Sequence, residues 1–321
     1  MIAGRKASSV RRTWAADRML PQRLALTACL ALTANLALAA CGPAAPGAGD
    51  PADDQLQSGV AGSGQPHTPQ TPLAPESIVS LNPCLDAILV EIAAPDQIAA
   101  LSHYSRDPRS TSIEPQVAAR YNYVGASAEE VLAIKPDLVL ASSFLDPASL
   151  AAMERAGLRV ASFGSPRNLA QSADQVREIA RLTGQETAGD ALITRMQAGR
   201  NPADLAGQPV SALLWQPGQI VPGEATLIGE LMREAGLVSH SAQQGLEQAD
   251  YVSLESVLAD PPDLLLVAGD SAGQSHPLLS ELEATRVEAF DPKLLFCGGP
   301  TVIAARERLN ALRSAMAQPQ S

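Results

Sequence analysis

Two copies of one sequence phrase, residues 127–141 and 253–267, constrain the fold of this chain more than any other feature. In each copy, a serine that can cap a helix is followed two residues later by a glutamate, whose charge favours a helix N-terminus. A Val-Leu pair follows, then a proline that ends the helix, and then an aspartate before an apolar run short enough to be a buried parallel strand. Parallel strands require helical crossovers, so the repeated unit predicts two similar α/β lobes with mainly parallel central sheets.

Length and charge narrow the class of protein. At 321 residues the chain is long enough for two domains that each bury a core. The formal net charge of -11 argues against nucleic acid as a partner, because phosphate binding depends on Lys and Arg. Residues 1–40 hold six basic residues and one acidic residue, so their removal lowers the net charge to about -16.

The first 40 residues have the pattern of an export signal. Positive charges end at Arg23, and an alanine- and leucine-rich stretch follows that is short for a membrane span. The sequence Leu38-Ala39-Ala40-Cys41 is similar to a bacterial lipobox, and this similarity implies that Cys41 becomes the lipidated first residue of the mature protein. We therefore expect an exported protein that is anchored to a bacterial membrane through lipid.

The composition changes along the rest of the chain predict its domains. Residues 41–75 are rich in Gly, Pro, Ala and Gln and predict a disordered tether. We expect an N-terminal α/β lobe at 76–167, a connecting helical segment at 168–205, a C-terminal α/β lobe at 206–317 and a short tail at 318–321. The last strand of the second lobe is expected near residues 294–296.

Two cysteines remain after export and lipidation, Cys84 and Cys297. Each is expected directly after a short strand, and therefore on the rim of its lobe. Three interpretations stay open: a disulfide between the lobes, contact with a metal or a metal-containing ligand, and two small buried residues without a special role.

The candidate ligand site lies beyond the carboxyl ends of the predicted strands, where helix N-termini and loop amides converge. Two such rims facing each other make a cleft whose polar and aromatic lining suits a bulky ligand. The residues at these positions are Asn82, Cys84, His103, Tyr104, Arg106, Tyr123, Ser142, Phe144, Trp215, Asp270, Cys297 and Gly298. No standard catalytic signature occurs in the sequence, so we expect neither an enzyme nor a catalytic residue or protein-held metal.

The segment Ile78-Val-Ser-Leu-Asn-Pro83, the loop Ser-His-Tyr-Ser-Arg-Asp-Pro at 102–108 and the repeated phrase together resemble the periplasmic substrate-binding proteins for cobalamin, heme and iron-siderophores. The resemblance covers about residues 77–316. It implies two lobes joined by one long rigid helix, with a ligand cleft between them. It also implies a monomer without an intrinsic cofactor that delivers a metal-chelate ligand to the permease of an ABC importer.

The resemblance implies roles for individual residues as well. Each lobe of such proteins docks onto the permease with a glutamate, and Glu129 and Glu230 match these two positions. Glu234 is an alternative match to Glu230. Stabilisation of a helix N-terminus is an equally good role for Glu129. Tyr104, Tyr123 and Trp215 match aromatic cleft residues of cobalamin-binding members, whereas Ser142 stands where those members have a tryptophan.

Two other classes of function stay open at this point. Related two-lobed folds hold metal clusters or catalyse reactions, and Cys84 and Cys297 would then be ligands, although two cysteines fall short of the usual four. The other class is a surface lipoprotein that binds only other proteins.

Overall fold

The structure is a computed structural model. It describes residues 74–199, 209–246, 249–270 and 274–317. The predicted signal, Cys41, nearly all of the tether and the tail lie outside the described residues. None of the helices in the described ranges is both long and apolar enough to cross a membrane.

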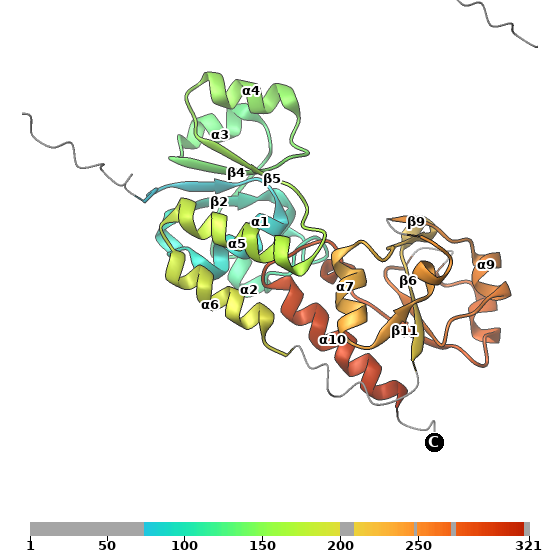
Figure 1. Ribbon diagram of the computed structural model, residues 1–321. Coiled ribbons are helices and arrows are strands. Elements are labelled where there is room, and N and C mark those ends of the chain that lie inside the picture. The colour runs from blue at the N-terminus through green and yellow to red at the C-terminus, as the bar shows by residue number, and fades with distance from the viewer. Residues whose placement is uncertain (1–73, 200–208, 247–248, 271–273, 318–321) are drawn as a thin grey trace, which may run out of the picture. The chain divides into compact units, whose positions relative to one another are not determined.

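The first lobe is built on a five-stranded sheet in the order β3-β2-β1-β4-β5, and every pair of neighbouring strands is parallel. Its strands are β1 (Ile78–Ser80), β2 (Ile98–Ser102), β3 (Tyr123–Val124), β4 (Leu138–Ser142) and β5 (Val160–Phe163). Helices cover both faces of the sheet (Figure 1). They are α1 (Pro83–Ile92), α5 (Leu169–Thr183) and α6 (Glu186–Gln197) on one face, and α3 (Ala128–Ile134) and α4 (Pro147–Arg155) on the other. The short α2 (Pro115–Ala118) precedes β3.

The second lobe repeats this plan with a four-stranded parallel sheet in the order β11-β10-β6-β8. Its strands are β6 (Val210–Trp215), β8 (Leu237–Ser239), β10 (Leu264–Val267) and β11 (Arg286–Ala289). The helices are α7 (Leu227–Glu234), α8 (His240–Gln243), α9 (Leu254–Ala259) and α10 (Thr301–Met316). A separate antiparallel pair joins β7 (Ile220–Val221) to β9 (Asp250–Tyr251). The predicted architecture of two α/β lobes with parallel sheets is confirmed.

Each copy of the repeated phrase forms a helix, a turn and a strand. The Ser127 hydroxyl accepts a hydrogen bond from the Glu130 amide at the start of α3, and the Ser253 hydroxyl accepts one from Ser256 at the start of α9. The strand that follows is β4 in the first lobe and β10 in the second. Both strands are buried on both faces, as expected of parallel strands between two layers of helices.

The connection after the first sheet differs from the predicted single long helix. It consists of two helices, α5 and α6, because Gly184 ends α5 in the left-handed conformation (φ 71°). The two helices then pack closely, since a side chain at Gly189 would overlap the Cβ of Ala180. Gly184 therefore forms the turn between the two helices, and Gly189 allows their close contact.

The prediction of a strand at residues 294–296 is wrong. The edge strand is β11, at Arg286–Ala289, and the 3-10 helix η6 (Pro292–Leu294) follows it. The Asp291 carboxylate accepts a hydrogen bond from the Lys293 amide, which stabilises a turn at this point. Leu294 and Leu295 are buried in the core beside α10 without being part of the sheet.

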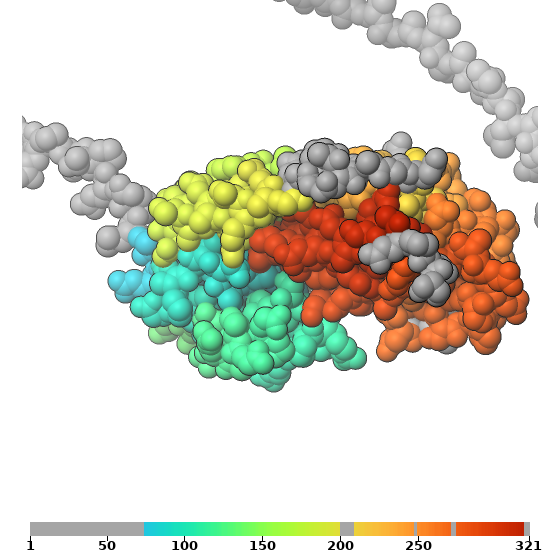
Figure 2. Space-filling view, turned by 90° about the horizontal axis from the view of Figure 1, so that it is seen from below, coloured from blue at the N-terminus to red at the C-terminus, as the bar shows by residue number. Residues whose placement is uncertain are grey.

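The segment from Cys297 to Arg306 connects the second lobe to elements of the first. A disulfide joins Cys297 to Cys84, and the Gly299 amide donates a hydrogen bond to the Ser172 hydroxyl at 2.8 Å. The hydroxyls of Thr301 and Ser112 are 2.7 Å apart. Figure 2 shows the consequence: the red surface of α10 lies against the yellow surface of α6.

Arg306 completes this junction from within α10. Its guanidinium is almost fully buried and donates hydrogen bonds to the carbonyls of Met196 and Ala198 at the end of α6. It also forms an ion pair of 3.2 Å with Glu234, which is the last residue of α7. We call Cys297–Arg306 and these partners the junction.

Asp86 is a buried carboxylate in α1 that holds the 3-10 helix η2 (His103–Arg106) in place. One carboxylate oxygen accepts hydrogen bonds from the Ser102 amide at 3.0 Å, the Ser102 hydroxyl at 2.5 Å and the Ser105 hydroxyl at 2.6 Å. Burial raises the pKa of Asp86 to about 6, although hydrogen bonds from Ser102, Ser105 and Ser80 oppose this shift.

We predict that stability falls as pH rises from about 4 to about 7, and that Asp86→Asn removes this fall. Between the pKa of the unfolded carboxyl, 3.8, and that of the folded one, about 6, the folded carboxyl keeps its proton while the unfolded one has lost it, so a rise in pH favours unfolding until the folded carboxyl is ionised as well. The shift corresponds to about 3 kcal/mol. Urea unfolding at several pH values measures it, and Asp190→Asn, at an exposed carboxylate, is the control. Parallel pH curves for wild type and Asp86→Asn would contradict the prediction.

Candidate functional site

A cavity of about 590 Å³ lies at the C-terminal edge of the first sheet. It is bounded by the ends of β1, β2 and β4 and by the starts of α1, α3 and α4. The lining residues are Leu81, Asn82, Pro83, Tyr104, Ala126, Ser127, Ser142, Phe144, Leu145, Asp146 and Ser149. The structure thus brings together four of the predicted ligand residues, Asn82, Tyr104, Ser142 and Phe144.

Two aromatic side chains give the cavity an apolar surface that is open to solvent. Phe144 is 80% exposed and Tyr104 is 49% exposed. His103 is exposed beside Tyr104, with ring centroids 4.0 Å apart and planes tilted by 34°. Large exposed aromatic rings are costly in water, so their presence at a cavity favours a ligand with a flat apolar face.

The polar groups of the cavity cap helices. The Asn82 carboxamide oxygen accepts a hydrogen bond from the Cys84 amide at 2.9 Å, and Ser127 caps α3. The Asp146 carboxylate accepts hydrogen bonds from the amide and the hydroxyl of Ser149, which hold the pKa of Asp146 below its usual value. The site therefore offers hydroxyl and amide groups and one carboxylate.

Arg106 and Tyr123 lie beside the cavity and not among its lining residues. The Arg106 guanidinium carbon is 5.2 Å from the centroid of the Tyr123 ring, a cation-π distance. The Tyr123 hydroxyl donates a hydrogen bond to the Ala118 carbonyl at 2.7 Å. Each of these predicted ligand residues thus has a partner within the chain.

Trp215 and Gly298 are corrections to the predicted site. Trp215 is fully buried in the core of the second lobe, and its indole N–H donates a hydrogen bond to the Val252 carbonyl at 2.9 Å, so its ring cannot reach a ligand. Gly298 is buried at the junction, where a side chain would overlap Ser172 and Pro166. Both residues are packed inside the folded chain.

Cys84 and Cys297 form a disulfide with a Cα–Cα distance of 5.0 Å. This is the first of the three interpretations that the sequence left open. The bonded sulfurs are not available as thiolates, so the pair does not provide the ligands of a metal cluster. Within the described ranges, no group of three or more His, Cys, Asp or Glu side chains is placed to hold a metal ion.

Asp270 is exposed on the loop after β10 in the second lobe. Its charge acts on Arg109 of the first lobe: the pKa of Arg109 is raised chiefly by its hydrogen bond with Asp107, and to a smaller extent by Asp270. The loops that follow β2 and β10 are therefore electrostatic neighbours.

Sequence reasoning missed several exposed apolar residues of the second lobe. Ile220 and Tyr251 are cross-strand partners on β7 and β9, with exposures of 44% and 60%, and Phe296, beside the disulfide, is 63% exposed. The strands β7 and β9 have only two residues each, too few for a visible alternation of apolar and polar residues. The cavity residue Asp146 was also missed, although Asp-Pro before an alanine-rich stretch is a helix-start signal.

The two predicted docking glutamates differ in their surroundings. Glu129 is exposed on α3, and among the described residues no side chain or backbone group bonds its carboxylate. Glu230 is half-buried on α7, and its carboxylate accepts a hydrogen bond from the Leu169 amide at the start of α5 at 2.7 Å. Glu234 is held by Arg306 at the junction.

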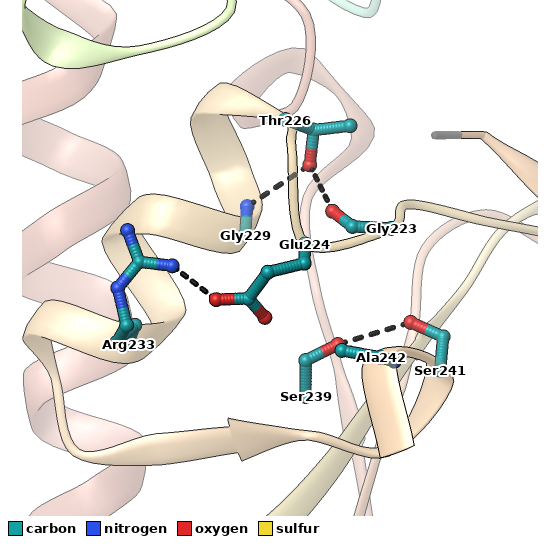
Figure 3. Close-up of polar contacts among 8 residues, drawn as sticks. All are labelled: Gly223, Glu224, Thr226, Gly229, Arg233, Ser239, Ser241 and Ala242. Carbon is teal, nitrogen blue, oxygen red and sulfur yellow. Dashed lines mark hydrogen bonds and ion pairs between the residues drawn. The ribbon is translucent and has the colours of Figure 1, made fainter. Parts of the chain in front are cut away.

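The start of α7 is fixed by the cap residue Thr226 and by the close packing of the preceding loop. The Thr226 hydroxyl accepts a hydrogen bond from the Gly229 amide and donates one to the Gly223 carbonyl, as Figure 3 shows. A side chain at Gly229 would meet that carbonyl at 2.7 Å, so only glycine lets the preceding loop pack on the helix. Glu224 of this loop is exposed and pairs with Arg233 on the outer side of α7 (Figure 3).

The family model of the periplasmic binding proteins matches residues 78–289. No curated protein sequence matches the chain. Among solved structures, the periplasmic heme-binding protein RhuT from Roseiflexus sp. RS-1 in apo form is 25% identical, with a TM-score of 0.62 over 76% of this chain and 99% of that one.

Two further solved structures share the fold at lower identity. A periplasmic heme-binding protein from Pseudomonas aeruginosa is 22% identical, with a TM-score of 0.59 over 77% of this chain and 95% of that one. The periplasmic vitamin B12 binding protein BtuF of Vibrio cholerae is 21% identical, with a TM-score of 0.58 over 77% of this chain and 99% of that one. Because the family model matches well over half of the sequence, and the fold has the two parallel sheets, the chain belongs to the periplasmic binding protein family.

Proposed function

We propose that this protein is the substrate-binding lipoprotein of an ABC importer, and that it captures a metal chelate for delivery to the permease. The ligand class is a cobalamin-like corrinoid, heme or an iron-siderophore. The observation that carries the proposal is the cavity at the edge of the first sheet, where the exposed rings of Phe144 and Tyr104 offer stacking surfaces. The proteins with similar structures include binders of heme and of vitamin B12.

The physical properties of the cavity fit a flat and bulky ligand. Its volume of about 590 Å³ is within the range of small-molecule sites, and it stays open to solvent, as a site that must take up and release its cargo requires. Stacking on aromatic rings does not depend on the identity of the metal.

The proposal predicts that the protein binds coloured chelates and that Phe144→Ala weakens this binding by about tenfold, the loss expected for one stacking contact. Titration with cyanocobalamin and hemin, followed by visible absorbance, measures the affinity. Val287→Ala, which shortens an exposed apolar side chain on the edge strand β11, is the control. Native mass spectrometry of the protein from the periplasm of its host then identifies the natural cargo. Absence of any bound small molecule in both experiments would refute the function.

We place the lipid anchor at Cys41, on the basis of the preceding sequence Leu38-Ala39-Ala40. The residues that follow have the Gly-, Pro- and Gln-rich composition of a tether, and a chain of this composition suits an anchored protein that must reach its partner. Lipidation at the tip of such a tether lets the binding protein find the permease without leaving the membrane surface.

Cys41→Ser is expected to move the protein from the membrane fraction to the soluble periplasmic fraction. The physical reason is that only the acyl chains hold the protein to the bilayer. Fractionation of host cells, with detection by antibody, measures this distribution. Equal partition of wild type and variant would contradict the anchor.

Docking on the permease is assigned to Glu129 and Glu230. Glu129 fits this role, since its carboxylate is exposed on α3. Glu230 must exchange its hydrogen bond with Leu169 for a contact with the permease. A contact between Glu230 and the permease would therefore also change the hydrogen bonding at the start of α5.

Glu129→Arg is predicted to reduce uptake of the ligand by at least tenfold and to leave its affinity for the isolated protein unchanged, because Glu129 is not among the residues that line the cavity. Glu230→Gln, which keeps a hydrogen-bond acceptor for Leu169, is expected to reduce uptake less. Glu154→Arg, an equal charge change on α4, is the control. Radiolabelled uptake by host cells measures the effect, and normal uptake with Glu129→Arg would remove the assignment.

A further inference from the structure

The charge of the cavity limits the chelates that it can hold. Of the described residues that line it, Asp146 alone is an acid, and none is Lys, Arg or His. The remaining polar groups are the carboxamide of Asn82 and the hydroxyls of Tyr104 and three serines. Among the side chains of the cavity, a ligand thus meets one negative charge and several neutral hydrogen-bonding groups.

The position of Asp146 favours the negatively charged form of its side chain. It caps α4, and its carboxylate accepts hydrogen bonds of 2.9 and 3.1 Å from the amide and the hydroxyl of Ser149. These hydrogen bonds lower the pKa of Asp146. The side chain is exposed, so its charge faces the solvent-filled space that a ligand would occupy.

The arginines nearest in sequence to the cavity loops are not among its lining residues, and two of them have partners within the chain. Arg109 forms an ion pair of 3.1 Å with Asp107, and Arg106 lies over the ring of Tyr123. Arg167, on the loop after β5, is outside the lining. Asp270 of the second lobe adds a further negative charge close enough to act on Arg109.

We propose that the site selects chelates whose periphery is neutral or cationic, as in corrinoids with amide side chains, over chelates that carry several carboxylates, and that Asp146 determines this selectivity. The inference rests on the proposed function. A carboxylate on the ligand would face Asp146 with no lining cation to pair with, whereas an amide can donate to the Asp146 carboxylate and accept from the lining hydroxyls.

Two matched pairs of probes test the inference without knowledge of the natural ligand. The first pair is cyanocobalamin and its dicarboxylic acid, made by hydrolysis of two side-chain amides. The second pair is hemin dimethyl ester and hemin. Within each pair the metal and the macrocycle are the same and the number of carboxylates differs by two. We expect the dissociation constant of the carboxylate form to be about fivefold higher at low salt, and the ratio to approach one at high salt.

Asp146→Asn is expected to reduce this ratio to about two or less, and to do so by improving the binding of the carboxylate forms. Asparagine still caps α4, so the fold of the site is kept. Asp190→Asn, an equal charge change at an exposed position on α6, should leave the ratio unchanged. If wild type bound the carboxylate form of a pair as tightly as the other form, or more tightly, the inference would be overturned and the proposed function would stand. An unchanged ratio in Asp146→Asn would have the same consequence. Failure of all four probes to bind would overturn the proposed function together with the inference.

Discussion

The covalent and buried-charge contacts of the junction are the constraint on which the rest of the structure depends. The disulfide between Cys84 and Cys297 fixes the start of α1, in the first lobe, to the chain just before α10. Arg306 then ties α10 to the ends of α6 and α7, and a buried guanidinium is stable only while these partners remain in place. The two lobes are thus linked at the junction by a covalent bond and by a buried ion pair.

The repeated phrase predicted much of the fold, and the structure gives a physical reason for the aspartate in each copy. In the first lobe the Asp137 carboxylate accepts hydrogen bonds from the Glu76 and Ser77 amides, just before β1. In the second, Asp263 does the same for the Ser211 amide in β6. Each aspartate thus joins the strand that it opens to the neighbouring parallel strand. The phrase specifies a helix cap, a strand and its register, and such local signals can be seen in sequence.

The errors have physical causes of a different kind. Trp215 was expected beyond the carboxyl end of its strand, but it is the last residue of β6 and pairs with Val267 of β10. Alternation then places Trp215 on the same face as Leu213, in the core under α9. The run at 294–296 is apolar because it packs beside α10, and composition cannot distinguish this from a strand. The partners of Gly298 and Glu230 are distant in sequence, and only the fold brings them together.

Helix α1 links the cavity to the junction. Its N-cap Asn82 lines the cavity, and Cys84 in its first turn forms the disulfide. Its buried Asp86 holds η2, the segment that carries Tyr104. Burial of a carboxylate costs free energy, and the hydrogen bonds to Ser102 and Ser105 recover part of that cost only in this conformation of the loop. The ring of Tyr104 is therefore positioned by the same helix that the disulfide fixes to the second lobe.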